Sequence, residues 1–185
     1  MQLWLPIVLS AVILFIASSV IWMFAPHHKT EWKEPPQVDA LRTFLRQSGI
    51  TAGAFVFPHM TAADRADKAK AAEKMKQAEE GPAGVLFLRA PGPMGMGRMM
   101  VQQFVFFLVV AALIALLDVH MMDRGTVYLA VFKRDAIIAF LTFGLGTAPE
   151  SIWFARPWKS FWLQAIDAAI YAGLLAGTFG WLWPR

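Results

Sequence analysis

The sequence predicts a mostly α-helical membrane protein, with four transmembrane helices and a small α+β extramembrane domain between the first and second helices. Two observations support this fold class. Of the 185 residues, 57% are hydrophobic and 16% are charged, which is more apolar than soluble proteins usually are. Four apolar runs are also long enough to cross a bilayer core, which takes about 20 residues of helix.

The first apolar run, residues 3–24, predicts a transmembrane helix within residues 1–24. The run is longer than the apolar region of a signal peptide, and no basic segment precedes it. Trp4 and Trp22 stand near its two ends, where amphipathic rings favour the headgroup layer. We therefore expect this helix to be retained in the membrane.

Residues 101–185 form the predicted three-helix transmembrane region, with spans at about 101–119, 135–155 and 163–183. All three are apolar on every side, whereas a helix of a soluble protein has one apolar stripe. Gly144, Gly146 and Pro149 interrupt the middle run. Because proline lacks a backbone donor, we expect a kink near Pro149.

Residues 25–100 predict the small extramembrane α+β domain. Helices are expected at 37–47 and 62–80, the second with Thr61 as its N-cap. Short strands at 54–57 and 84–89 are expected to pair. Two strands and two helices bury little surface, so we expect the domain to lean on the membrane helices or on another subunit.

The distribution of Lys and Arg predicts the orientation. Four spans place both termini on one side, and short loops with more basic residues stay in the cytoplasm. The side of the 25–100 segment carries seven basic residues close to the spans, against four on the other side: Lys29, Lys33, Arg42, Arg89, Arg98, Arg156 and Lys159, against Arg124, Lys133, Arg134 and Arg185. We expect residues 25–100 to be cytoplasmic and the termini periplasmic.

The last predicted span carries a ridge of small residues at four-residue spacing: Ala165, Ala169, Gly173 and Gly177. Such ridges allow two helix backbones to approach closely. The ridge is therefore a candidate helix-packing or partner interface. Packing against other helices of the same chain is the alternative.

Two acidic residues, Glu150 and Asp167, fall within the predicted spans. Ionisable groups in a membrane are expensive and often functional, so these two could belong to a proton or ion path. The alternative is a cluster of ion pairs with Arg156 and Lys159 at the membrane surface. We favour the cluster, because the centres of the predicted spans are apolar.

The chain has no cysteine, so any soft-metal site must use histidine and methionine. The candidates are His59, Met60, Met94 and Met96, and copper is the metal that such ligands suit. Methionines that only fill packing gaps are the alternative. No histidine lies inside a predicted span, so no haem or other cofactor is expected.

Two stretches of the sequence resemble a family of uncharacterised bacterial inner-membrane proteins. One is WLPIVLSAV near the start; the other is SIWFARPW together with IDAAIYAGLLAGTFGWLWP near the end. The resemblance implies an inner-membrane location and four helices, and it supplies no catalytic residues.

These observations predict a non-catalytic accessory or structural subunit of a larger bacterial inner-membrane complex, of respiratory or photosynthetic type. No sequence signature of an enzyme is present, and the net charge of +4 reflects membrane topology rather than nucleic-acid binding. The expected partners are lipid and other integral membrane subunits. A component of small-solute or ion transport and a copper-handling membrane protein are the alternatives.

Overall fold

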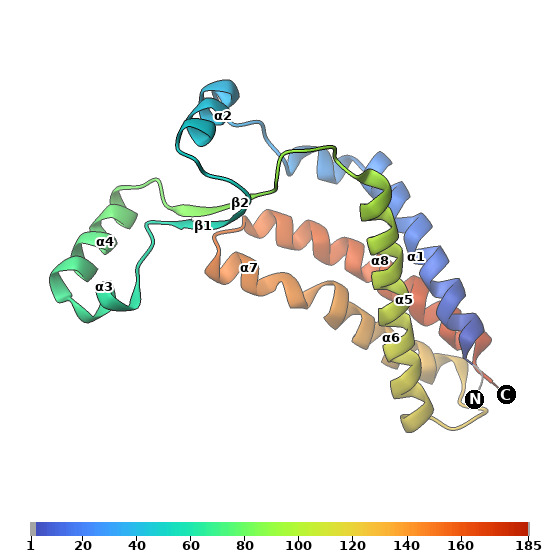
Figure 1. The fold of residues 1–185 in the computed structure, drawn as a ribbon. Helices are drawn as coiled ribbons and strands as arrows, with labels where there is room; N and C mark the ends of the chain where they lie inside the picture. The colour runs from blue at the N-terminus through green and yellow to red at the C-terminus, as the bar shows by residue number, and fades with distance from the viewer. Residues whose placement is uncertain (1–2, 185) are drawn as a thin grey trace. The chain divides into compact units, whose positions relative to one another are not determined.

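The computed structural model describes residues 3–184, which divide into two compact units (Figure 1). Unit 1 contains the described residues up to 33, residues 94–151 and those from 156 onward. Unit 2 contains residues 34–93 and 152–155. Each unit is described by itself.

Three helices of unit 1 are long and apolar enough to cross a membrane: α1 (Trp4–Phe24), α5 (Met96–Met121) and α8 (Trp158–Leu182). Their most apolar windows are buried within the chain to only 22%, 33% and 50%, respectively. Much of their apolar surface therefore faces outward, which suits lipid or other helices better than water. The prediction of membrane-capable helices in these three places is confirmed.

The predicted span at 135–155 is not one helix. Helix α6 begins earlier, at Tyr128, and runs to Phe143; it is followed by a 3₁₀ turn, η2 (Leu145–Thr147), and by α7 (Ala148–Trp153). The helix is interrupted at Gly144 rather than at Pro149. Pro149 lies in the first turn of α7, where its missing N–H costs nothing. Among residues 3–184, three helices rather than four have the length of a span.

Helices α6 and α8 approach closely at two points along their length. A Cβ added at Gly144 would meet the Cβ of Ala168 at 3.0 Å, and one added at Gly180 would meet the ring of Tyr128 at 2.8 Å. These two contacts match the beginning of α6 with the end of α8, so the helices are antiparallel. Glycine is needed at both points because any side chain would push the helices apart.

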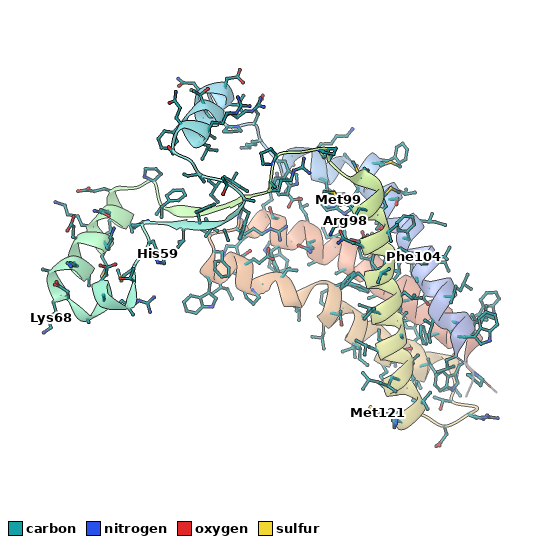
Figure 2. The ribbon with its side chains drawn as sticks, in the orientation of Figure 1. His59, Lys68, Arg98, Met99, Phe104 and Met121 are labelled. Carbon is teal, nitrogen blue, oxygen red and sulfur yellow. The ribbon has the colours of Figure 1, made fainter. Side chains whose placement is uncertain are left out.

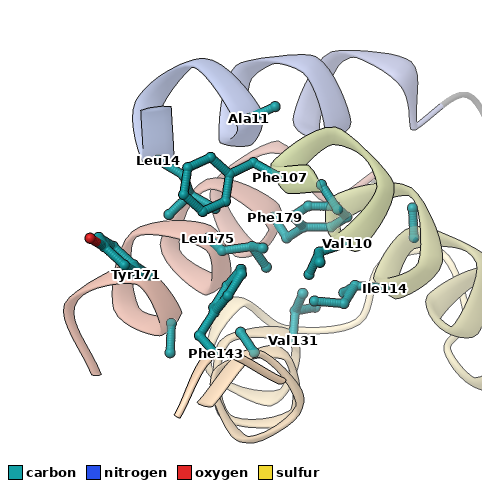
Figure 3. Close-up of a cluster of buried hydrophobic side chains, with 14 of the residues drawn as sticks. Ala11, Leu14, Phe107, Val110, Ile114, Val131, Phe143, Tyr171, Leu175 and Phe179 are labelled. Atoms are coloured by element: carbon teal, nitrogen blue, oxygen red, sulfur yellow. The ribbon is translucent and has the colours of Figure 1, made fainter. Parts of the chain in front are cut away.

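The core of unit 1 lies between α1, α5, α6 and α8 (Figure 3). Phe107, Phe143 and Tyr171 pack edge to face, with every pair of ring centroids 5.9 Å apart. Edge-to-face pairs of this kind stabilise a core by about 0.5–1.5 kcal/mol each beyond the area that they bury. The aromatic cluster therefore ties three helices together near one end of the bundle.

Helix α1 is followed at once by a 3₁₀ turn, η1 (Pro26–Thr30). Pro26 stops the α-helix and starts the turn with its fixed φ. The turn carries His27 and His28, which would otherwise continue along the axis of α1.

Unit 2 contains α2 (Val38–Gln47), β1 (Gly53–Phe57), α3 (Ala62–Ala66), α4 (Lys68–Glu80) and β2 (Gly84–Leu88). The strands pair antiparallel as expected, with Gly53 opposite Leu88 and Phe57 opposite Gly84. The prediction of a single helix at 62–80 is wrong, because the helix is interrupted at Asp67. The Asp67 carboxylate accepts hydrogen bonds from the N–H groups of Ala69 and Lys70 and so caps the start of a second helix. None of the described residues in α2, α3 and α4 is buried, in keeping with the thin core that was predicted.

Candidate functional site

Two consecutive histidines share one carboxylate at one end of the bundle. Nε2 of His27 lies 2.9 Å from Oδ1 of Asp167, and Nε2 of His28 lies 2.7 Å from Oδ2 of the same side chain. His28 and Asp167 are buried, and His27 is partly buried. The turn after α1 and the first half of α8, 139 residues apart in sequence, therefore meet at this carboxylate.

His28 has a second carboxylate partner on its other nitrogen. Its Nδ1 lies 2.9 Å from Oε2 of Glu31, whose side chain also interacts with Ser160 and Arg156. Burial lowers the pKa of His28, but hydrogen bonds to Glu31 and Asp167 outweigh it, and the pKa is raised above 6.5. Burial likewise raises the pKa of Glu31, and hydrogen bonds from His28, Ser160 and Arg156 outweigh it, so that pKa is lowered below 4.5.

The pair of His28 and Glu31 is therefore charged over a wide pH range. The stabilisation from His28 is complete below pH 6.5 and is lost as pH rises through its raised pKa. The stabilisation from Glu31 is complete above pH 4.5 and is lost as pH falls through its lowered pKa.

Neighbouring side chains hold this end of the bundle in place. The indole of Trp22 stacks on the ring of His28, with centroids 4.2 Å apart and planes at 7°. Arg156 donates to Glu150 at 2.5 Å and to Glu31 at 3.4 Å. Lys159 donates to the Thr30 hydroxyl at 2.9 Å. The turn after α1 is thus joined to the start of α8 by several bonds, and the His28 ring has little freedom to rotate.

A cavity of about 560 Å³ adjoins the cluster, and Trp22 and Asp167 are in its wall. Polar side chains from α1, α5, α6 and α8 also line it, among them Ser18, Gln103, Thr142 and Gln164. Two polar atoms of the wall are buried without a hydrogen-bond partner among the described residues, the hydroxyl of Tyr171 and Oε1 of Gln164. The interior of the bundle is therefore partly polar at this end.

The cluster has the chemistry of a metal-binding site. One ligand atom from each of His27, His28 and Asp167 lies within 4.8 Å of the others. Two imidazoles and one carboxylate are a frequent ligand set for divalent transition metals, with remaining positions left for water or a bound molecule. The same atoms can also share protons, since histidine exchanges them near neutral pH.

The two acidic residues predicted within the spans have different partners. Glu150 is exposed and pairs with Arg156, which is one of the expected ion pairs. Asp167 bonds to the two histidines instead of to Arg156 or Lys159. Of the expected cluster, the pair of Glu150 with Arg156 is therefore present, whereas Asp167 belongs to the histidine site.

The four residues predicted as copper ligands do not belong to one compact unit. His59 and Met60 lie in unit 2, whereas Met94 and Met96 lie in unit 1. Figure 2 shows His59 on the segment after β1 and Met99, which follows the predicted ligands, near the start of α5. Met96 is in the cavity wall. Copper binding by these residues stays a prediction.

The predicted ridge of α8 lies beside the face that packs within the chain. The buried face contains Ala168, Ala172, Ala176 and Gly180. Of the ridge itself, Ala169 is exposed and Ala165, Gly173 and Gly177 are half-buried. A Cβ added at Gly173 would meet no atom within 4 Å, so the ridge is still open along part of its length.

A second group of buried charges lies at the other end of α5. Asp118 accepts a hydrogen bond from Arg134, and Asp135 lies close enough for its charge to interact with theirs. Both carboxylates are fully buried. Sequence reasoning missed this group because its members sit at the ends of two predicted spans, where charges are ordinarily solvated.

Sequence reasoning also missed the site role of His27 and His28. A usable signal exists on α8, where Gln164, Asp167 and Tyr171 recur at three- and four-residue spacing and therefore share one helix face. A polar stripe of this kind inside an apolar run indicates a lined interior. The pairing of that stripe with two histidines far away in the chain has no local signal.

Comparison with known proteins adds no family. No protein-family model, no curated protein and no solved structure matches this chain. The resemblance to bacterial inner-membrane proteins therefore stays a prediction.

Proposed function

We propose that this protein is a non-catalytic accessory subunit of a larger bacterial inner-membrane complex, of respiratory or photosynthetic type. One observation carries the proposal: α8 has two adjacent rows of small residues, and the chain itself buries one of them but covers the other only in part. Ala168 and Gly180 of the filled row contact α6 closely, whereas Gly173 of the other row has open space above it.

The open row suits a transmembrane helix of another subunit. Apolar surface alone does not drive helices together in lipid, and small residues do so by allowing close backbone contact. The large outward-facing apolar surface of α1 and α5 supports the same function, since it leaves room for both lipid and neighbouring helices.

The proposal includes four membrane crossings, with α6, η2 and α7 together forming the third. The antiparallel contacts between α6 and α8 support it. Tyr128 lies beside Gly180 and Gly144 lies beside Ala168, so α6 runs alongside much of α8 and would cross much of the same membrane depth. In this arrangement residues 25–100 are cytoplasmic and the termini periplasmic, in keeping with the excess of Lys and Arg.

Purification from the native membrane in mild detergent, by a histidine-free affinity tag, tests the accessory function. We expect a stable set of membrane subunits with the wild-type chain and loss of that set with Gly173→Leu, whose added side chain fills open space and leaves the fold intact. Ile170→Leu, on an exposed part of the same helix, is the control and should retain the partners. A wild-type chain that migrates alone at 20.6 kDa would contradict the proposal.

Transport of a small solute or ion is a second candidate, favoured by the polar-lined cavity next to Asp167. Flux across reconstituted vesicles should then fall in Asp167→Asn, and also in Glu150→Gln if the path reaches the surface at Glu150. Flux that both substitutions leave unchanged would remove this candidate.

A further inference from the structure

We infer that His27, His28 and Asp167 bind one divalent transition-metal ion beside the cavity. This inference goes beyond the accessory function and does not depend on it. It combines the geometry of the three ligands, a carboxylate behind one of them, and unpartnered polar groups in the adjoining wall.

The ligand atoms are already gathered. Both histidines present Nε2 to the same carboxylate, at 2.9 and 2.7 Å. Ligand atoms around a tetrahedral ion such as zinc lie about 3.3 Å apart, because metal–ligand distances are about 2.0–2.1 Å. The two histidine–carboxylate distances would therefore lengthen by about half an ångström around an ion, and all three ligand atoms already lie within 4.8 Å of one another.

The two nitrogens of His28 suit it to bind an ion. A metal-bound imidazole binds through one nitrogen and donates from the other, and Nε2 of His28 faces Asp167 while Nδ1 faces Glu31. With an ion bound by Nε2 and Asp167, Nδ1 still donates to Glu31. A carboxylate that accepts from the far nitrogen is the usual support of a metal-bound histidine, since it fixes the tautomer and the ring orientation.

The partners of the three carboxylates at this end support the same assignment. Glu31 and Glu150 both contact Arg156. Among the described residues, the ion-pair partners of Asp167 are the two histidines. A divalent cation would neutralise this carboxylate and would release to solvent the protons that the Nε2 atoms carry.

The cavity leaves room to complete the coordination shell. Three protein ligands leave at least one position for water or a small molecule. The Tyr171 hydroxyl and the side-chain carbonyl of Gln164 are buried in the same wall without partners among residues 3–184. Tyr171 is 8% exposed and lies one turn beyond Asp167 on α8, so its hydroxyl is suited to bind a molecule held at the ion.

Metal binding by the full-length protein tests the inference. The chain is purified in detergent with a histidine-free tag, stripped with a chelator and dialysed against Zn²⁺, and bound metal is measured by mass spectrometry. We expect one zinc ion per chain, and binding weakened roughly a hundredfold or more in His27→Gln and Asp167→Asn. Glu31→Gln, which removes only the support of His28, should weaken binding by roughly 10- to 100-fold.

Two controls separate this site from adventitious binding. His120→Gln changes an exposed histidine that bonds within its own helix, and His59→Gln changes a histidine of unit 2; both should bind zinc like wild type. Co²⁺ in place of Zn²⁺ should give a visible absorption band that His27→Gln abolishes. Zinc retention by wild type no greater than by Asp167→Asn and His27→Gln would overturn the inference, and so would an equal loss in His120→Gln.

Discussion

The two ends of the helix bundle each bury carboxylates beside basic side chains, but the basic side chains differ in kind. At one end Asp118 and Asp135 lie with Arg134, and none of these three residues lines the cavity. At the other end Asp167 lies with His27 and His28, and the polar-lined cavity begins beside it. Arginine keeps its proton at any relevant pH, whereas histidine can exchange its proton for a metal ion.

This difference indicates a division of roles. The ion pair of Arg134 with Asp118 joins α6 to α5, and its arginine stays charged. Two histidines on a single carboxylate, next to a cavity, form a site whose occupant can change. The predictions that follow test this comparison, from the largest expected effect to the smallest.

The largest effect is expected from Arg134→Met. Without the guanidinium, Asp118 and Asp135 stay buried without a cation, and breaking a buried ion pair in this way costs about 3–5 kcal/mol. Unfolding in detergent, followed by circular dichroism, measures the loss. Lys133→Met changes the exposed neighbour and should leave stability nearly unchanged. Equal stability of the two variants would show that the ion pair of Arg134 with Asp118 does not stabilise this end of the bundle.

Gly180→Ala should destabilise the contact between α6 and α8, which joins the two ends. Its Cβ would come within 2.9 Å of the Tyr128 ring and within 3.2 Å of the Tyr128 backbone oxygen, and overpacking of this kind costs about 1–3 kcal/mol. Gly173→Ala meets no neighbour and should be neutral or stabilising by up to about 1 kcal/mol. Thermal unfolding of the two variants in parallel provides the test, and the opposite order would refute the antiparallel packing.

Asp167→Asn should cost the metal-free protein about 1–2 kcal/mol, because the amide oxygen still accepts one hydrogen bond but loses its charge. The sharper result is the response to zinc. Wild type should gain about 2.7 kcal/mol when free zinc is a hundred times its dissociation constant, and the variant, whose binding is at least a hundredfold weaker, should gain at most about 0.4 kcal/mol. The gain is measured by the shift in melting temperature. An equal gain in wild type and variant would show that zinc does not bind through Asp167, and would contradict the proposed difference between the two ends.

The smallest effect is expected from Thr30→Val, which removes the exposed hydrogen bond from Lys159. Exposed bonds of this kind contribute roughly 0.5 kcal/mol. Chemical unfolding should therefore barely distinguish the variant from wild type, and zinc binding should be retained. A loss of zinc binding would mean that the exposed bond from Lys159 to Thr30, rather than the buried carboxylates, holds the turn of residues 26–30 in place.

The sequence predicts the long helices well because their signal is local. Continuous apolar runs mark α1, α5 and α8 within a few residues, and the alternation of turns and short apolar segments marks both strands. The break at Gly144 and the early start of α6 at Tyr128 depend on contacts with α8, which no local pattern contains. Asp67 is a similar case, since its capping bonds outweigh the helix propensity of the residues around it.

The candidate site was only partly predictable. Asp167 is conspicuous as an acidic residue in an apolar run, and its position was predicted. Its partners His27 and His28 are far away in the chain, and only the antiparallel course of α1 and α8 brings them together. Residues that meet through tertiary structure have no spacing to recognise.

Thiol labelling tests the four-crossing arrangement most directly. The sequence contains no natural cysteine, so only the introduced cysteines can react. Single cysteines are introduced as Thr51→Cys, Arg124→Cys and Phe154→Cys and are labelled with a membrane-impermeant maleimide in intact and in inverted vesicles. The proposed arrangement predicts that positions 51 and 154 react from one side and position 124 from the other. Reaction of positions 124 and 154 from the same side would show that α6, η2 and α7 do not cross, and would contradict the account.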